Sequence, residues 1–140
     1  MTDMGTLVDS NVLLDVVRQD PVWWEWSSAA LGRCADEGPL VINAVVYSEI
    51  SASYAAVEEL DAALGEDSFV RAPLPWRAAF LAGRAHVEYR RRGGLRDRTL
   101  PDFLIGAHAA VLGLRLLTRD AGRYRRYFPT VDVVGPDARR

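Results

Sequence analysis

Residues 6–11 read Thr6-Leu7-Val8-Asp9-Ser10-Asn11, a short apolar run that ends in three polar residues. A run of this length is typical of a buried strand, and the polar residues after it are typical of the turn into a helix. A helical segment follows over residues 12–18, and the order of strand and helix returns further along the chain. This alternation predicts a parallel sheet with helices on both faces.

The rest of the chain continues this pattern. We expect five strands, at residues 6–9, 40–42, 68–71, 114–118 and 131–134. Helices are expected between them, at residues 12–18, 22–36, 44–54, 55–64, 75–92, 99–112 and within 119–127. The predicted fold is therefore a three-layer α/β/α arrangement around a central parallel sheet of about five strands. The 140 residues are enough for one domain over residues 1–136, with a loose tail at 137–140.

The composition excludes several classes of protein. The chain has 17 basic and 19 acidic residues, and every basic residue is an arginine, so a mechanism that requires lysine is excluded. Cys34 is the only cysteine, so no intrachain disulfide is possible, and a reducing cytoplasm fits. The sequence contains neither a signal peptide nor an apolar run long enough to cross a bilayer. We therefore expect a soluble cytoplasmic protein with no membrane association.

Four acidic residues stand at the ends of apolar runs or in the first turns of helices: Asp9, Glu49, Asp102 and Asp120. The carboxyl ends of neighbouring parallel strands share one edge of a sheet, so these carboxylates can meet there. A cluster of carboxylates without histidine or cysteine suits a hard cation such as Mg²⁺ or Mn²⁺. Metal-assisted hydrolysis of a phosphodiester is the leading hypothesis.

Each of these acids also has a structural interpretation. Asp9 is a good N-cap for the helix that follows it. Asp102 matches the third position of a capping box opened by Thr99, and Asp120 is a common type of turn residue. Glu49 is harder to explain in this way, because it falls on the apolar side of its helix, where an unpaired carboxylate is unfavourable.

Two sets of arginines flank the predicted site. Arg96 and Arg98, in the loop before Asp102, are candidates for binding the phosphates of the substrate. The preceding Arg90-Arg91-Arg92 is better explained as a solvated helix end. A second basic set lies near Asp120, and it would offset the acidic cleft for a polyanionic substrate; its members are Arg119, Arg123, Arg125 and Arg126.

Three further features have mainly structural interpretations. Thr118 is expected to hold a carboxylate through its hydroxyl group. His86 and His108 are expected to be structural residues. Trp23, Trp24 and Trp26 lie on one predicted helix and cannot all be buried, so part of this cluster is expected at an interface.

The chain resembles a known family in four segments. These are Leu7-Val8-Asp9-Ser10-Asn11-Val12-Leu13-Leu14-Asp15, Tyr47-Ser48-Glu49-Ile50, Leu100-Pro101-Asp102-Phe103-Leu104-Ile105-Gly106-Ala107-His108-Ala109 and Leu117-Thr118-Arg119-Asp120. In this order and at this spacing they resemble the PIN-domain ribonucleases, and among them the VapC toxins of bacterial type II toxin–antitoxin systems. The resemblance covers nearly the whole chain.

This resemblance implies a PIN fold and an endoribonuclease that depends on Mg²⁺ or Mn²⁺. It implies an acidic quartet at Asp9, Glu49, Asp102 and Asp120, with Asp9 and Asp102 as the metal ligands. Many relatives have asparagine at or near the position of Asp120, and the resemblance does not assign this residue as a metal ligand. The resemblance also implies inhibition by a cognate VapB-like antitoxin whose C-terminal segment lies across the cleft, and homodimers are common in the family. It does not determine which RNA is cleaved.

Other readings of the same acids remain. A haloacid-dehalogenase-like phosphatase requires a second aspartate two residues after the first, where this chain has Asn11, and it usually requires a lysine. A response-regulator receiver also requires the missing lysine. The remaining alternatives are a PIN-like domain that binds RNA or protein without cleaving, and a housekeeping RNA-processing nuclease.

Overall fold

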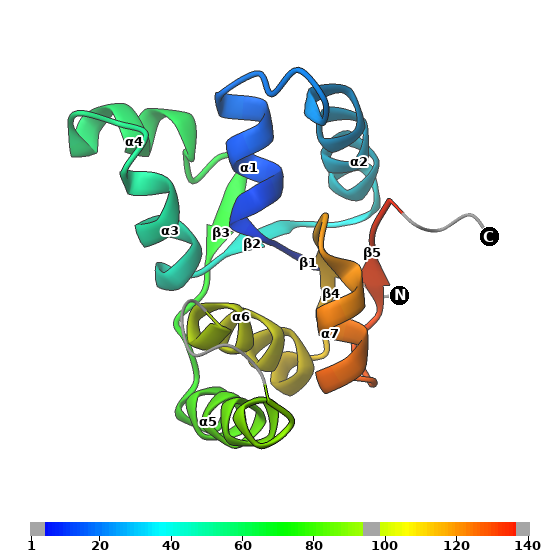
Figure 1. Ribbon diagram of the computed structural model, residues 1–140. Helices are drawn as coiled ribbons and strands as arrows, with labels where there is room; N and C mark the ends of the chain where they lie inside the picture. Colours follow the sequence, from blue (N-terminus) through cyan, green and yellow to red (C-terminus); the bar gives the residue numbers. More distant parts are fainter. Residues whose placement is uncertain (1–4, 94–98, 137–140) are drawn as a thin grey trace.

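The structure, a computed structural model, describes residues 5–93 and 99–136. Five parallel strands form one sheet in the order β3-β2-β1-β4-β5 (Figure 1). The strands are short: β1 Thr6–Val8, β2 Leu40–Ile42, β3 Phe69–Arg71, β4 Arg115–Leu117 and β5 Val133–Val134. This arrangement confirms the predicted α/β fold with a central parallel sheet of five strands.

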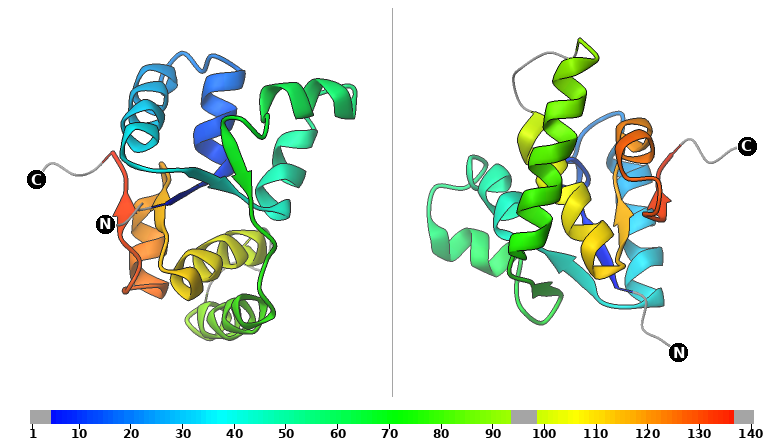
Figure 2. Two further views of the ribbon diagram at one scale, coloured as in Figure 1. Left: turned by 180° about the vertical axis from the view of Figure 1, so that it is seen from behind. Right: turned by 90° about the horizontal axis from the view of Figure 1, so that it is seen from below.

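Seven helices connect and cover these strands within the described part of the chain. They are α1 Ser10–Val17, α2 Trp24–Glu37, α3 Ala44–Ser51, α4 Val57–Ala63, α5 Trp76–Arg91, α6 Thr99–Leu112 and α7 Ala121–Tyr127. Helices α1 and α2 lie on one face of the sheet, and α6 and α7 lie on the other (Figure 1). Helix α5 packs on the outer side of α6, and α3 contacts both α1 and α6 (Figure 2).

The core is built around the central strand β1. Leu7 pairs in register with Val41 of β2 on one side and with Leu116 of β4 on the other. Leu7 and Leu116 are fully buried, and Val41 is almost fully buried. Complete burial of such a side chain contributes about 1.5–3 kcal/mol to folding. The carboxyl ends of β1 and β4 are thereby held side by side in the middle of the sheet.

The element boundaries differ from the sequence expectations in detail. Helix α1 begins at Ser10, because Asp9 caps it by accepting a hydrogen bond from the Ser10 N–H group. Helix α3 ends at Ser51, three residues earlier than expected, and β5 has only two residues. Asn43 caps α3 as a side-chain acceptor for Val46 N. The expected tail at 137–140 lies outside the described residues.

None of the described helices is long and apolar enough to cross a membrane.

Candidate active site

The predicted site residues gather where the strand order reverses. Strands β1, β2 and β3 follow one another towards one edge of the sheet, whereas β4 lies on the other side of β1. In parallel sheets, ligands bind at the carboxyl ends of the strands beside this point. Asp9 directly follows β1, and Thr118 directly follows β4. Both residues are buried, with at most 3 % of their surface exposed.

Asp9 is held by three donors. Its Oδ1 atom accepts a hydrogen bond from Ser10 N at 2.8 Å. Its Oδ2 atom accepts hydrogen bonds from the Thr118 hydroxyl at 2.8 Å and from the Tyr124 hydroxyl at 3.0 Å. Burial nevertheless raises the pKa of Asp9, and the nearby Glu49 carboxylate adds to this increase. The site therefore fixes the direction of this carboxylate but leaves its negative charge poorly compensated.

Glu49 reaches the same region from α3. The side chain is half-buried, and its Oε1 atom accepts a hydrogen bond from the Ser10 hydroxyl at 2.7 Å. This bond supplies a polar partner on the otherwise apolar side of the helix, where Val46 and Ile50 are fully buried. Ser10 follows Asp9 in the chain, so this turn contacts both carboxylates.

Asp102 lies in the first turn of α6 and pairs with Arg123 of α7 through its Oδ2 atom. Burial raises the pKa of Asp102 to about 6, and repulsion from the Asp9 and Glu49 carboxylates contributes to this value, whereas Arg123 opposes it. The three carboxylates thus share one electrostatic environment. The capping-box bond to Thr99 remains a prediction, because the side chain of Thr99 is outside the described residues.

Asp120 lies at the rim of this group. Its side chain is 54 % exposed, and its Oδ2 atom is 4.0 Å from Nη1 of Arg123. Its backbone N–H donates to the Thr118 hydroxyl at 3.0 Å. Asp120, Asp9 and Asp102 all add to the burial effect that raises the pKa of the Tyr124 hydroxyl well above its ordinary value. Asp120 therefore belongs to the same charged region but is less enclosed.

Thr118 connects these residues, as its position after β4 suggested. Its hydroxyl donates to Asp9 and accepts from the Asn11 side-chain amide at 3.4 Å and from Asp120 N. The Asn11 Oδ1 atom in turn accepts from Arg119 N at 3.2 Å. One hydroxyl thus ties the exit of β1 to the exit of β4.

The basic set near Asp120 is only partly available to a substrate. Arg119 forms two hydrogen bonds with the buried Asp15 carboxylate, at 2.7 and 3.1 Å, and its guanidinium group lies over the Trp23 ring. This pairing supports α1 from within the protein, so the positive charge of Arg119 is already compensated by Asp15. Arg123 is partly exposed and faces the carboxylates. Arg96 and Arg98 lie outside the described residues.

Sequence reasoning missed the contributions of Ser10 and Tyr124. Ser10 could have been suspected from its place directly after Asp9. Tyr124 carries no comparable signal, because its contact with Asp9 spans 115 positions in the chain. That contact depends on how α7 packs against α6. A Cβ atom at Gly106 of α6 would lie 3.0 Å from the Tyr124 ring and 2.5 Å from the Phe128 ring.

The donor chemistry at this edge fits a hard divalent cation. Within residues 5–93 and 99–136, no three or more His, Cys, Asp or Glu side chains form a ready-made metal site. Asp102 is engaged by Arg123, and Glu49 by Ser10. Asp9 and Asp102 both have raised pKa values, mainly because they are buried, and a bound cation would relieve the repulsion between the carboxylates. The residues fit Mg²⁺ or Mn²⁺ after a rearrangement of the Arg123 contact.

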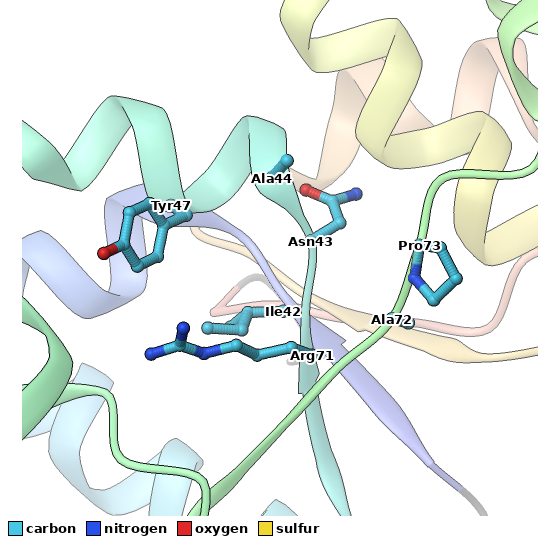
Figure 3. Close-up of a pocket in the computed structure, with 7 residues that line it drawn as sticks. All are labelled: Ile42, Asn43, Ala44, Tyr47, Arg71, Ala72 and Pro73. Carbon is cyan, nitrogen blue, oxygen red and sulfur yellow. The ribbon is translucent and has the colours of Figure 1, made fainter.

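A pocket separate from these acids lies at the carboxyl ends of β2 and β3 (Figure 3). Ile42, Tyr47 and Arg71 are among the residues that line it, and none of the four carboxylates does. Arg71 is bound to Asp61 at 3.0 Å and lies over the Tyr47 ring. This pocket is therefore distinct from the acidic site.

The family model of the PIN domain matches residues 6–129. The chain belongs to the PIN domain family. PIN domains form a nuclease family, and the matched range contains all four acids. A search of curated proteins gave no match.

Solved structures of toxin–antitoxin complexes share the PIN fold of this chain. VapBC2 from Rickettsia felis, bound to a promoter DNA fragment, is 17 % identical over 96 % of this chain and 100 % of its own, with a TM-score of 0.71. VapBC-1 from nontypeable Haemophilus influenzae is 14 % identical over 94 % and 98 %, with a TM-score of 0.69. A toxin–antitoxin complex from Klebsiella pneumoniae is 22 % identical over 94 % and 97 %, with a TM-score of 0.66. At these identities, the similarity establishes the fold.

Proposed function

We propose that this PIN domain is an endoribonuclease that depends on Mg²⁺, with Mn²⁺ as a possible substitute. The main supporting observation is the convergence of Asp9, Glu49 and Asp102 at the point where the strand order reverses. The pKa of Asp102 reaches about 6 because the residue is buried beside the other two carboxylates. Several carboxylates in one partly dry region are unfavourable alone and become favourable around a divalent cation.

In this proposal Asp9 and Asp102 are the metal ligands, and Asp120 completes the acidic set at the rim. The bound cation would polarise a phosphoryl oxygen and lower the pKa of a water molecule. Glu49 is proposed to orient that water and accept its proton, because its carboxylate interacts electrostatically with Asp9 and Asp102 from a separate helix. The Thr118 and Tyr124 hydroxyls hold Asp9 in one orientation, and the Ser10 hydroxyl does the same for Glu49.

The substrate is proposed to be RNA, with its backbone across the carboxyl edge of the sheet. Arg96 and Arg98 are the proposed phosphate contacts, since they precede the helix that carries Asp102. Arg123 is a further candidate, because its guanidinium group already lies between Asp102 and Asp120 and would meet a phosphate beside the cation.

We propose further that the chain is the toxin of a type II VapBC-like system. The three solved structures compared above are toxin–antitoxin complexes, and the match covers nearly the whole of the matched chain in each. The proposed partners are a VapB-like antitoxin and a second copy of the chain, and the proposed compartment is the cytoplasm. A small antitoxin gene is expected directly upstream of the gene for this chain.

Induced expression in a bacterial host tests the toxin assignment. Wild-type protein is expected to arrest growth, whereas Asp9→Asn and Asp102→Asn are expected to be harmless at the same soluble level. Co-expression of the upstream gene should restore growth. Arrest by the Asp9→Asn variant would instead indicate a domain that binds RNA or protein without cleaving it.

A further inference from the structure

A buried hydrogen bond joins the start of α3 to the middle of α6. Asn43 Nδ2 lies 2.9 Å from His108 Nδ1, and at most 3 % of either residue is exposed. The Oδ1 atom of the same amide accepts from Val46 N at 2.9 Å and so caps α3. Figure 3 shows the Asn43 side chain at the start of α3, with its nitrogen turned towards α6. One side chain thus holds two helices.

The chemistry of the pair determines the state of the histidine. An amide nitrogen can only donate, so His108 Nδ1 accepts and the ring hydrogen is on Nε2. Burial lowers the pKa of His108, which favours this neutral form. The Nε2 atom is buried and has no hydrogen-bond partner within residues 5–93 and 99–136. A buried donor without a partner is unfavourable for folding, so general stability does not explain a histidine here.

The position of the pair suggests a different role. Asn43 lies six positions before Glu49, and His108 lies six positions after Asp102. At 1.5 Å per residue, each carboxylate is therefore about 9 Å along its helix from the tether. Glu49 and Asp102 face the same site and repel each other. A fixed point between the two helices would limit how far this repulsion can separate them.

We propose that Asn43 and His108 are positioning residues, whose hydrogen bond fixes the separation between the carboxylates of Glu49 and Asp102. The positioning role rests on the proposed nuclease function, because only a catalytic metal site requires a fixed spacing of these carboxylates. Its physical basis is independent, because it concerns the spacing of α3 and α6. Neither residue contacts the substrate in this proposal.

The first experiment measures that spacing directly. Spin labels are placed at Ala52→Cys and Leu100→Cys, which are exposed and lie near the ends of α3 and α6 remote from the tether, in a Cys34→Ala background. Asn43→Ser keeps an N-cap but loses the amide donor, and His108→Leu removes the acceptor. Both substitutions are expected to broaden the distance distribution between the labels in the full chain. A distribution as narrow as that of the parent would overturn the proposal.

The unfolding temperatures of the variants separate a specific effect on helix spacing from a general loss of stability. His108→Leu removes the unpaired Nε2 donor but leaves the buried Asn43 Nδ2 donor without its acceptor, so it is expected to unfold at about the same temperature as the parent. Ile105→Val, also buried in α6, is expected to lower the unfolding temperature without broadening the distribution. Broadening in Ile105→Val equal to that in Asn43→Ser would show a general packing effect and overturn the specific role of the pair.

The second experiment measures Mn²⁺ affinity by electron paramagnetic resonance. Asn43→Ser and His108→Leu are each expected to weaken binding about tenfold, and the double variant no further, because both break one bond. Broadened distances with unchanged Mn²⁺ affinity would overturn the positioning role. The two proposals can also fail separately. If the wild type without spin labels neither binds Mn²⁺ nor cleaves RNA, while the distance distribution between the labels broadens in the variants, the nuclease proposal fails and the tether between the helices stands.

Discussion

The Tyr124 hydroxyl donates a hydrogen bond to Asp9 Oδ2 at 3.0 Å, although the two residues are 115 positions apart in the chain. The Thr118 hydroxyl donates to the same oxygen at 2.8 Å. Two donors on one buried oxygen hold the carboxylate in a single rotamer and leave its other oxygen to Ser10 N. The docking of α7 therefore sets the geometry of the acid at the exit of β1.

Replacement of Tyr124 by phenylalanine should weaken metal binding while the ring volume is kept. Loss of one donor to a buried carboxylate is expected to raise the pKa of Asp9 further and to lower Mn²⁺ affinity about tenfold. Mn²⁺ titration followed by electron paramagnetic resonance measures this change. Tyr127→Phe in the same helix is the control, because that ring packs on Phe103. Equal affinities for wild type and Tyr124→Phe would disprove the role of the hydroxyl group.

Gly106 should be intolerant of even a methyl group. A Cβ atom there would lie 2.5 Å from Phe128 Cδ2 and 3.0 Å from Tyr124 Cδ1, so the Phe128 ring or the α7 segment before it must shift. Gly106→Ala is expected to lower the free energy of unfolding by about 1–3 kcal/mol and to weaken Mn²⁺ binding. Urea unfolding and the same Mn²⁺ titration test both effects.

Gly83→Ala in α5 is the matched control for that substitution. Apart from the neighbouring residues and backbone of α5 itself, no heavy atom of residues 5–93 and 99–136 lies within 4 Å of a Cβ at Gly83, and alanine is the better helix former. The free energy of unfolding is expected to rise by about 0.5–1 kcal/mol, with metal affinity unchanged. If Gly106→Ala changed the free energy of unfolding no differently from Gly83→Ala, the tight contact between α6 and α7 would be contradicted.

Much of this architecture could be predicted from the sequence because it depends on local patterns. Short apolar runs alternate with helical segments, and this order predicts a parallel sheet whose strand ends share an edge. The acids that follow those runs could therefore be assigned to one region, and Asp9, Glu49 and Asp102 do share one electrostatic environment. The catalytic and ligand roles of the four acids stay predictions.

The partners of these acids could not be predicted, because they depend on packing between distant elements. Arg119 and Arg123 lie in the same basic stretch, yet one pairs with Asp15 and the other with Asp102. Which arginine faces which acid depends on the turn after β4, which carries Arg119, and on the orientation of α7, which carries Arg123. That orientation follows from the contact of Tyr124 and Phe128 with Gly106. No periodicity in the sequence encodes such a choice.

Arg123 should compete with a metal ion for Asp102. Its positive charge pairs with Asp102 and lies 4.0 Å from Asp120, where it opposes the approach of a cation. Arg123→Gln is expected to raise Mn²⁺ affinity several-fold and to weaken RNA binding in the absence of metal. Arg126→Gln, an exposed position in the same helix, should change neither quantity as much. Weaker Mn²⁺ binding by Arg123→Gln would contradict the competition.

Asp102 should make the folded protein less stable as the pH rises, the opposite of the usual effect of an aspartate. Its pKa is raised from 3.8 to about 6, so the folded state binds more protons than the unfolded state between these values. Stability without metal is therefore expected to fall as the pH rises from 4 to 7, and this residue contributes about 2 kcal/mol to that fall. Asp102→Asn should remove the contribution and be the more stable protein at pH 7.

Urea unfolding in EDTA at several pH values measures this effect. Asp67 is an exposed carboxylate remote from the site, so Asp67→Asn is the control. Its free energy of unfolding should change with pH as steeply as that of the wild type. Addition of Mg²⁺ at pH 7 should stabilise the wild type more than Asp102→Asn, because the cation binds only the folded site. If the free energy of unfolding of Asp102→Asn fell with pH as steeply as that of the wild type, the raised pKa of Asp102 would be contradicted.

Metal-dependent RNA cleavage by the purified protein tests the proposed function most directly. Wild-type protein is expected to cleave a mixed RNA substrate in Mg²⁺ or Mn²⁺ and to stop in excess EDTA. Asp9→Asn and Asp102→Asn should lower the rate by about 100-fold or more, since the metal supplies several kcal/mol of transition-state stabilisation. Cleavage that persists in EDTA, or wild-type rates in both variants, would contradict a metal site at the exits of β1 and β4.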